Sequence, residues 1–185
     1  MNVIIGEDIV GTSALLVLFG LLSTAIATDF SSHRIPNLLL LPALSLALML
    51  HTLTGGIDGL ITAGGGLALG LAMLMPLYVT GGMGAGDVKL LGVVGSFLGP
   101  WGAVVAGLAT MMAGAILGVV YILWQRVWPA LELYATQLLS PHTGANRPAI
   151  PHAGRSTTQT KIPYAPAIAA GTMAALWYIG AWPIN

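Results

Sequence analysis

Long runs of apolar residues, separated by short polar segments, make up most of the chain. A helix that crosses a bilayer needs about 20 apolar residues to cover a hydrocarbon core of about 30 Å. The pattern therefore predicts an all-α fold with six transmembrane helices and no soluble domain. The predicted spans are residues 9–28, 38–53, 59–80, 88–98, 101–125 and 164–182.

The fourth predicted span, residues 88–98, is the shortest. Residues 90–125 carry no charge, but Gly99-Pro100 interrupts them. Proline disfavours helix at the residue before it and suits the first turn of a new helix, so two helices are expected here. Because about 11 residues rise only about 17 Å along a helix, we expect the start of this span to be recessed below the membrane surface.

The basic residues predict the orientation of the spans. Cytoplasmic loops beside membrane spans are enriched in lysine and arginine. With six spans and both termini outside, in the periplasm, every basic residue falls on the cytoplasmic side: Arg34, Lys89, Arg126, Arg147, Arg155 and Lys161. Residues 126–161 then form a cytoplasmic loop, whose start up to residue 139 can continue as a helix along the membrane interface. The whole chain, 1–185, is predicted to be a single transmembrane domain of the bacterial inner membrane.

Composition agrees with a membrane protein and excludes other classes. Hydrophobic residues make up 56% and charged residues 6%, whereas about a quarter of a soluble domain is charged. The mean hydropathy is +0.88. The net charge of zero implies no nucleic-acid partner, and there is no cysteine for a thiolate metal site. The histidines lack metal-ligand spacing and are expected at surfaces or interfaces, so we expect no metal and no cofactor.

Two aspartates lie where predicted spans meet the cytoplasmic side. Asp29 follows the first span and Asp87 opens the fourth, so helices packed side by side could bring their carboxyl groups together. Acidic residues near spans are costly and usually functional. Two close carboxylates share one proton. The ionised one can take a proton from an attacking water, and the protonated one can donate to a peptide carbonyl. The pair therefore predicts aspartic proteolysis.

The residues around these aspartates allow more than one interpretation. Gly84 and Gly86 can adopt backbone conformations closed to other residues, and another chain can approach them closely. They would therefore leave room for an extended substrate peptide beside Asp87. The alternative is a flexible turn in which the aspartate is an ordinary helix cap. Lys89 and Arg34 fit the role of positive anchors at the cytoplasmic interface. Lys89 could instead bias the carboxylate pair or meet an acidic residue of a substrate.

Glycines spaced four residues apart occur twice, in Gly66-x-x-x-Gly70 and Gly114-x-x-x-Gly118. This spacing places small residues on one face of a helix, which lets a second helix approach closely. We expect tight helix packing at both places and no chemistry.

The chain resembles the type IV prepilin peptidase family, the membrane aspartic endopeptidases of the GxGD class, in three segments. They are Asp29 with Arg34-Ile35-Pro36-Asn37, then Gly84-Ala85-Gly86-Asp87-Val88-Lys89-Leu90-Leu91, and later Lys161-Ile162-Pro163-Tyr164-Ala165-Pro166-Ala167. The resemblance implies that Asp29 and Asp87 are the catalytic residues. It also implies a prepilin or pseudopilin substrate, with a basic leader and a hydrophobic helix, held in the lipid bilayer. The leader would be cut on the cytoplasmic side, after a glycine that precedes the helix.

Larger members of this family carry an extra N-terminal region, often with paired cysteines, that is linked to methylation of the new pilin N-terminus. Here the first apolar run begins near residue 9 and cysteine is absent. The chain therefore resembles the short, peptidase-only members that serve Tad/Flp-type pili, and we expect no N-methyltransferase activity.

Other functions remain open on the residues alone. A small membrane transporter or proton relay would also use carboxylates at membrane level. Inverted repeats would favour that reading, and none is seen in the sequence. An assembly subunit that keeps the motif without activity is a third possibility. Within the enzyme class, archaeal preflagellin processing uses the same pair and is the nearest alternative.

Overall fold

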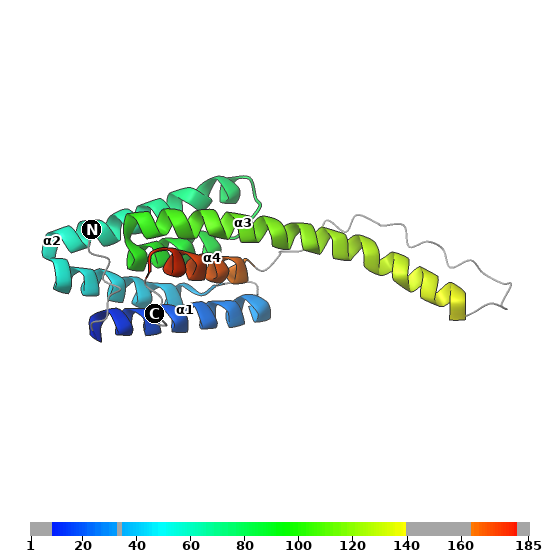
Figure 1. Ribbon diagram of the computed structural model, residues 1–185, viewed down its shortest axis with the longest axis horizontal. Coiled ribbons are helices and arrows are strands. Elements are labelled where there is room, and N and C mark those ends of the chain that lie inside the picture. Colours follow the sequence, from blue (N-terminus) through cyan, green and yellow to red (C-terminus); the bar gives the residue numbers. More distant parts are fainter. Residues whose placement is uncertain (1–8, 33–34, 140–163, 181–185) are drawn as a thin grey trace. The chain divides into compact units, whose positions relative to one another are not determined.

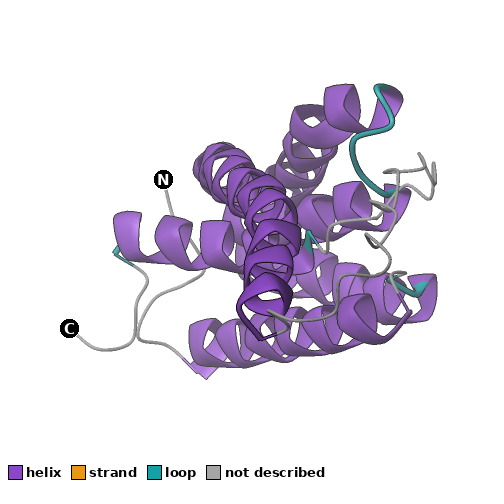
Figure 2. Ribbon diagram, turned by 90° about the vertical axis from the view of Figure 1, so that its right-hand side faces the viewer, coloured by secondary structure: helices purple, strands orange, loops and turns teal. Residues whose placement is uncertain are grey.

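The computed structural model describes residues 9–32, 35–139 and 164–180. These residues form four helices: α1 (Ile9–Ser32), α2 (Asn37–Val79), α3 (Ala85–Leu139) and α4 (Ala165–Tyr178). Helices and a few short non-helical segments account for all of the described chain, and Figure 2 shows no strand among them. The predicted all-α class is confirmed.

Helix α2 folds back on itself at Gly56. This glycine has φ 58° and ψ −134°, in the left-handed region that glycine enters at little cost. Gly59 then lies so close to the carbonyl group of His51 that it has no room for a Cβ. In a continuous helix eight residues rise about 12 Å, so the chain must reverse here. The two arms, 37–55 and 57–79, run back along each other (Figure 1).

Helix α3 has a similar break at Gly99, where φ is 73° and ψ is −178°. The break predicted at Gly99-Pro100 is therefore confirmed. A Cβ at Gly95 would lie 3.0 Å from the Cβ of Ala103, which shows that the residues on either side of the break pack together. The second arm continues to Leu139, beyond the predicted end at residue 125. The predicted continuation of the helix up to residue 139 is confirmed, while its location along the membrane interface stays a prediction.

Within the described residues, three helices are long and apolar enough to cross a membrane: Gly11–Ser31, Asn37–Val79 and Ala85–Trp128. The second and third have 43 and 44 residues, about twice the length of one crossing. α4 has 14 residues, where the apolar pattern predicts a span over 164–182. The end of that span lies outside the described residues. The count of six crossings and the outer location of both termini stay predictions.

The contacts divide the chain into two compact units. The first contains α1, α2, α3 as far as Gly114, and α4, and the second contains α3 from Ala115 onward. Both aspartates belong to the first unit.

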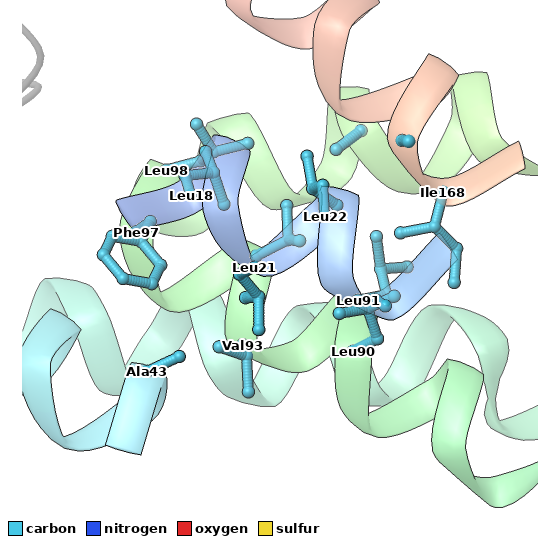
Figure 3. Close-up of a cluster of buried hydrophobic side chains, with 14 of the residues drawn as sticks. Leu18, Leu21, Leu22, Ala43, Leu90, Leu91, Val93, Phe97, Leu98 and Ile168 are labelled. Carbon is cyan, nitrogen blue, oxygen red and sulfur yellow. The ribbon is translucent and has the colours of Figure 1, made fainter. Parts of the chain in front are cut away.

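The core of the first unit is built from α1, the first arm of α3, and α4, with α2 alongside (Figure 3). Its buried members include Leu18, Leu21, Leu22, Leu90, Leu91, Val93, Phe97 and Ile168. Many other large apolar side chains are exposed, for example Leu38 (84%) and Trp177 (76%). Lipid tails are as apolar as leucine, so close packing rather than the hydrophobic effect must hold such helices together.

The two glycine pairs of the sequence differ in the structure. Gly66 and Gly70 both face the first arm of α3, where a Cβ would collide with the backbone at Gly95 and Leu91. Gly114 packs against the ring of Tyr164, but Gly118 has no heavy atom within 4 Å of its Cβ position. The predicted close packing is confirmed for the first pair and for Gly114, whereas no described residue packs against Gly118.

Candidate active site

Asp29 and Asp87 are both buried. Their side chains are 6% and 9% exposed, whereas Asp58 near the bend of α2 is exposed. Burying a carboxylate is costly unless hydrogen bonds or charges compensate for the lost water. The two buried aspartates therefore require partners within the protein.

Asp29 lies in the last turns of α1. Its Oδ2 accepts a hydrogen bond from the backbone N–H of Ala165, at 3.1 Å. Ala165 is the first residue of α4. The first N–H groups of a helix have no acceptor within the helix, and the helix dipole favours negative charge there. The start of α4 therefore supplies a suitable partner for the carboxyl group.

Asp87 is the third residue of α3, so it is not the residue that precedes the helix. Its Oδ2 accepts a hydrogen bond from the Gly84 N–H at 3.2 Å, and its own N–H donates to the Gly84 carbonyl at 3.2 Å. This is one half of a capping box, in which a side chain in the first turn reaches back to the capping residue. A Cβ at Gly84 would lie 3.2 Å from the same carboxylate oxygen, so glycine leaves this oxygen the space it occupies.

Gly86 lies against the connection between α1 and α2. A Cβ on Gly86 would be 3.2 Å from the Cβ of Ile35 and 3.4 Å from its backbone nitrogen. The lack of a side chain thus allows the start of α3 to touch the segment that follows Asp29. The predicted role of Gly84 and Gly86 in making room for an extended peptide stays a prediction.

Lys89 is exposed and its Nζ donates a hydrogen bond to Oδ1 of Asn37, at 3.1 Å. Asn37 is the first residue of α2. This bond joins the first residue of α2 to the second turn of α3 at the protein surface. Arg34, the other basic residue predicted to support the site, lies outside the described residues.

These contacts bring three parts of the chain to one end of the first unit. The end of α1 meets the start of α4 through Asp29 and Ala165. The segment after α1 meets the start of α3 through Ile35 and Gly86. In Figure 1 the end of α1, the start of α4 and the connection between α2 and α3 share this end of the bundle. Asp29 and Asp87 therefore lie at the same end.

The bond between Asp29 and Ala165 is not among the contacts predicted from the sequence. In the sequence, the segment Lys161-Ile162-Pro163-Tyr164-Ala165-Pro166-Ala167 carries only a family resemblance. Its Pro166 was the available signal, because proline is typical of the first turn of a helix and so marks where free N–H groups occur.

His51 is buried rather than at a surface or interface, which corrects that expectation. Its side chain is 4% exposed, and its Nε2 lies 3.2 Å from the carbonyl oxygen of Phe97. It lines a cavity of about 390 Å³ beside the break of α3 at Gly99. The rise along α2 from Asn37 to His51 is about 21 Å, so this histidine is remote from the aspartates.

The type IV leader peptidase family matches residues 16–121, a segment that contains both aspartates and more than half of the chain. The chain belongs to the type IV leader peptidase family. This confirms the resemblance stated from the three motif segments. Over 166 residues the chain is 30% identical to the prepilin leader peptidase/N-methyltransferase of Bacillus subtilis (strain 168). That alignment covers 88% of this chain and 54% of the relative, so the chain spans about half the length of this curated relative. No solved structure matches the chain.

Proposed function

We propose that this chain is a membrane-embedded aspartic endopeptidase that removes the leader peptide of prepilins or prepilin-like proteins. Membership of the type IV leader peptidase family supports the reaction class. The observation that carries the assignment of residues is the burial of Asp29 and Asp87 at one end of the same helical unit. The relative's printed name describes a prepilin leader peptidase, and that activity is extended to this chain as part of the proposal.

The proposed reaction uses the two carboxyl groups with one shared proton. The ionised carboxylate takes a proton from a water molecule while the water oxygen bonds to the peptide carbonyl carbon. The protonated carboxyl gives its proton to the carbonyl oxygen, which yields a tetrahedral diol. When the diol collapses, the C–N bond breaks, the departing amine receives the proton of the pair, and the other carboxylate takes a proton from a diol hydroxyl as the new carbonyl forms. One proton again remains on the pair, which acts as a unit, so neither aspartate has a permanent role as acid or base.

Fixed orientation of both carboxyl groups supports this mechanism. Asp87 is held by the Gly84 N–H and Asp29 by the Ala165 N–H, each through a backbone donor that cannot change rotamer. Reacting groups held close to productive geometry lower the barrier because little reorganisation is left for the reaction itself. Lys89 and Arg34 act in the proposal as positive anchors at the cytoplasmic interface.

The proposed topology has six crossings, with both termini in the periplasm and the aspartates near the cytoplasmic face of the bacterial inner membrane. α1, the two arms of α2, the two arms of α3, and α4 would supply these crossings. The breaks at Gly56 and Gly99 support this count, because each separates two apolar arms. The substrate's hydrophobic helix would lie in the bilayer and its basic leader in the cytoplasm.

A leader-removal assay tests the proposal. The chain is co-expressed with a candidate prepilin, and the loss of the leader is followed by gel shift and by mass spectrometry of the new N-terminus. Asp29→Asn and Asp87→Asn should each insert into the membrane and abolish cleavage. Asp58→Asn is the matched control, because this exposed acid should be dispensable. Full cleavage by either of the first two variants would refute the assigned pair. The same mass measurement shows whether a methyl group is added, and we expect none.

A further inference from the structure

The first turn of α4 is seated closely against α3. Gly114 of α3 leaves space for the ring of Tyr164, and a Cβ at residue 114 would be 2.8 Å from ring atom Cε1. Further along α4, a Cβ at Gly171 would be 2.6 Å from the backbone nitrogen of Thr110. Only glycine allows such close approach of helix backbones. The position of α4 is therefore determined by its contacts with α3.

This seating determines where the Ala165 N–H points. Ala165 follows Tyr164 directly, and its N–H donates to Oδ2 of the buried Asp29. Hydrogen bonds to an ionised acceptor are stronger than those between neutral groups, and the donor here belongs to the backbone of a packed helix. Asp29 at the end of α1 is thus oriented by a segment 136 residues later in the chain.

We propose that the start of α4 is a positioning element of the active site. The N–H of Ala165 holds the Asp29 carboxylate in its orientation toward the site. The lack of a side chain at Gly114 leaves space for the Tyr164 ring, and the packing of this ring positions the Ala165 N–H. Ala165 is a positioning residue that acts through Asp29. This inference rests on the proposed function, because the orientation matters to the reaction only if Asp29 belongs to the catalytic pair.

The contact itself is testable without any activity. Labelling tyrosine with ¹³C at the carbonyl and alanine with ¹⁵N selects the amides of Tyr–Ala pairs, of which the sequence contains only Tyr134-Ala135 and Tyr164-Ala165. In Asp29→Ala the Ala165 amide should exchange its hydrogen at least about tenfold faster than in the wild type, because it loses its acceptor. The Ala135 amide is an internal control, and Asp87→Ala is the control variant. An unchanged Ala165 amide in Asp29→Ala would overturn the contact.

To test the role of this contact in the reaction, the N–H of Ala165 must be removed without changing the side chain. Replacing Ala165 by lactic acid turns this amide into an ester and removes the donor while the side chain stays a methyl group. We expect kcat for prepilin cleavage to fall by about tenfold to a hundredfold. KM should stay within about twofold, because the lost interaction serves the reacting group rather than substrate binding. The matched control places lactic acid at Ala169, which removes an ordinary N–H bond inside the same helix.

A second pair of variants tests the start of α4 by changing its packing against α3. Gly114→Ala should displace the Tyr164 ring and lower kcat, while Gly118→Ala, with open space at its Cβ position, should leave kcat unchanged. If the ester at Ala165 and the ester at Ala169 lower kcat equally, or neither lowers it, the positioning role is wrong. If the wild type cuts no prepilin, the proposed function fails, and the amide exchange alone then decides the contact between Ala165 and Asp29.

Discussion

Gly66 of α2 and Gly95 of α3 lie backbone to backbone, and a Cβ on either residue would collide with the carbonyl group of the other. This contact joins the second arm of α2 to the first arm of α3, the arm that begins with Asp87. Without a hydrophobic driving force between helices in lipid, such close approach is what stabilises their association. The two glycines therefore contribute to the position of one aspartate.

We predict that Gly66→Ala destabilises the protein by about 1–3 kcal/mol, because overpacking forces the two helices apart. The measurement is thermal unfolding in detergent or nanodiscs. Gly64→Ala is the matched control, since nothing lies within 4 Å of its Cβ position. Alanine is a better helix former than glycine, so the control should be neutral or more stable by up to about 1 kcal/mol. Equal stability of the two variants would show that the contact between α2 and α3 is not tight.

Gly84→Ala should slow cleavage without preventing insertion. Its Cβ would lie 3.2 Å from Oδ2 of Asp87, so the carboxyl group or the turn must move by a few tenths of an ångström. Small misplacements of a reacting group are costly, and we expect kcat to fall about tenfold or more with KM little changed. Ala85→Ser, a change at the exposed neighbouring residue, is the control. Wild-type turnover by Gly84→Ala would mean that the position of this oxygen does not limit the reaction.

The orientation of the helices in the membrane can be measured with single introduced cysteines, because the chain contains none. Asp58→Cys near the bend of α2 and Ala85→Cys at the start of α3 are both exposed positions. In intact cells a membrane-impermeant maleimide should label residue 58 from the periplasm. Residue 85 should react only after the membrane is permeabilised. The reverse pattern would invert the proposed topology, and labelling of both from outside would contradict a crossing by the second arm of α2.

Lys89 offers a test of the two roles that the sequence leaves open. Its bond to Asn37 is exposed. A double-mutant cycle of Lys89→Gln with Asn37→Ala should therefore give a coupling free energy of unfolding of at most about 1.5 kcal/mol. If Lys89 is only an interfacial anchor, Lys89→Gln should change kcat by less than about threefold. A much larger loss in kcat, without loss of stability, would assign Lys89 to the carboxylate pair or to the substrate.

Local signals in the sequence were sufficient for several features. The apolar runs, the break at Gly99-Pro100 and the motif ending in Asp87 each depend on residues that are near one another in the chain. Helix formation, helix breaking and glycine turns obey such local rules, so the helical class and the candidate aspartates could be predicted. The close packing of Gly66 and Gly70 also followed from their spacing.

Other features depend on which helix faces meet, and local sequence signals could not predict them. Gly114 and Gly118 have the same spacing as Gly66 and Gly70, yet among the described residues only Gly114 has a neighbour packed against it. His51 has no motif around it, and its contact with the carbonyl oxygen of Phe97 joins residues 46 positions apart in the chain. The donor that reaches Asp29 is a backbone N–H, a group that every residue except proline carries, so no side chain marks it in the sequence. The helical class, the break at Gly99 and the two candidate carboxyl groups could be predicted from local residue patterns. The packing of α4 against α3 determined which N–H reaches Asp29, because contacts between distant segments depend on the shapes of whole helix faces.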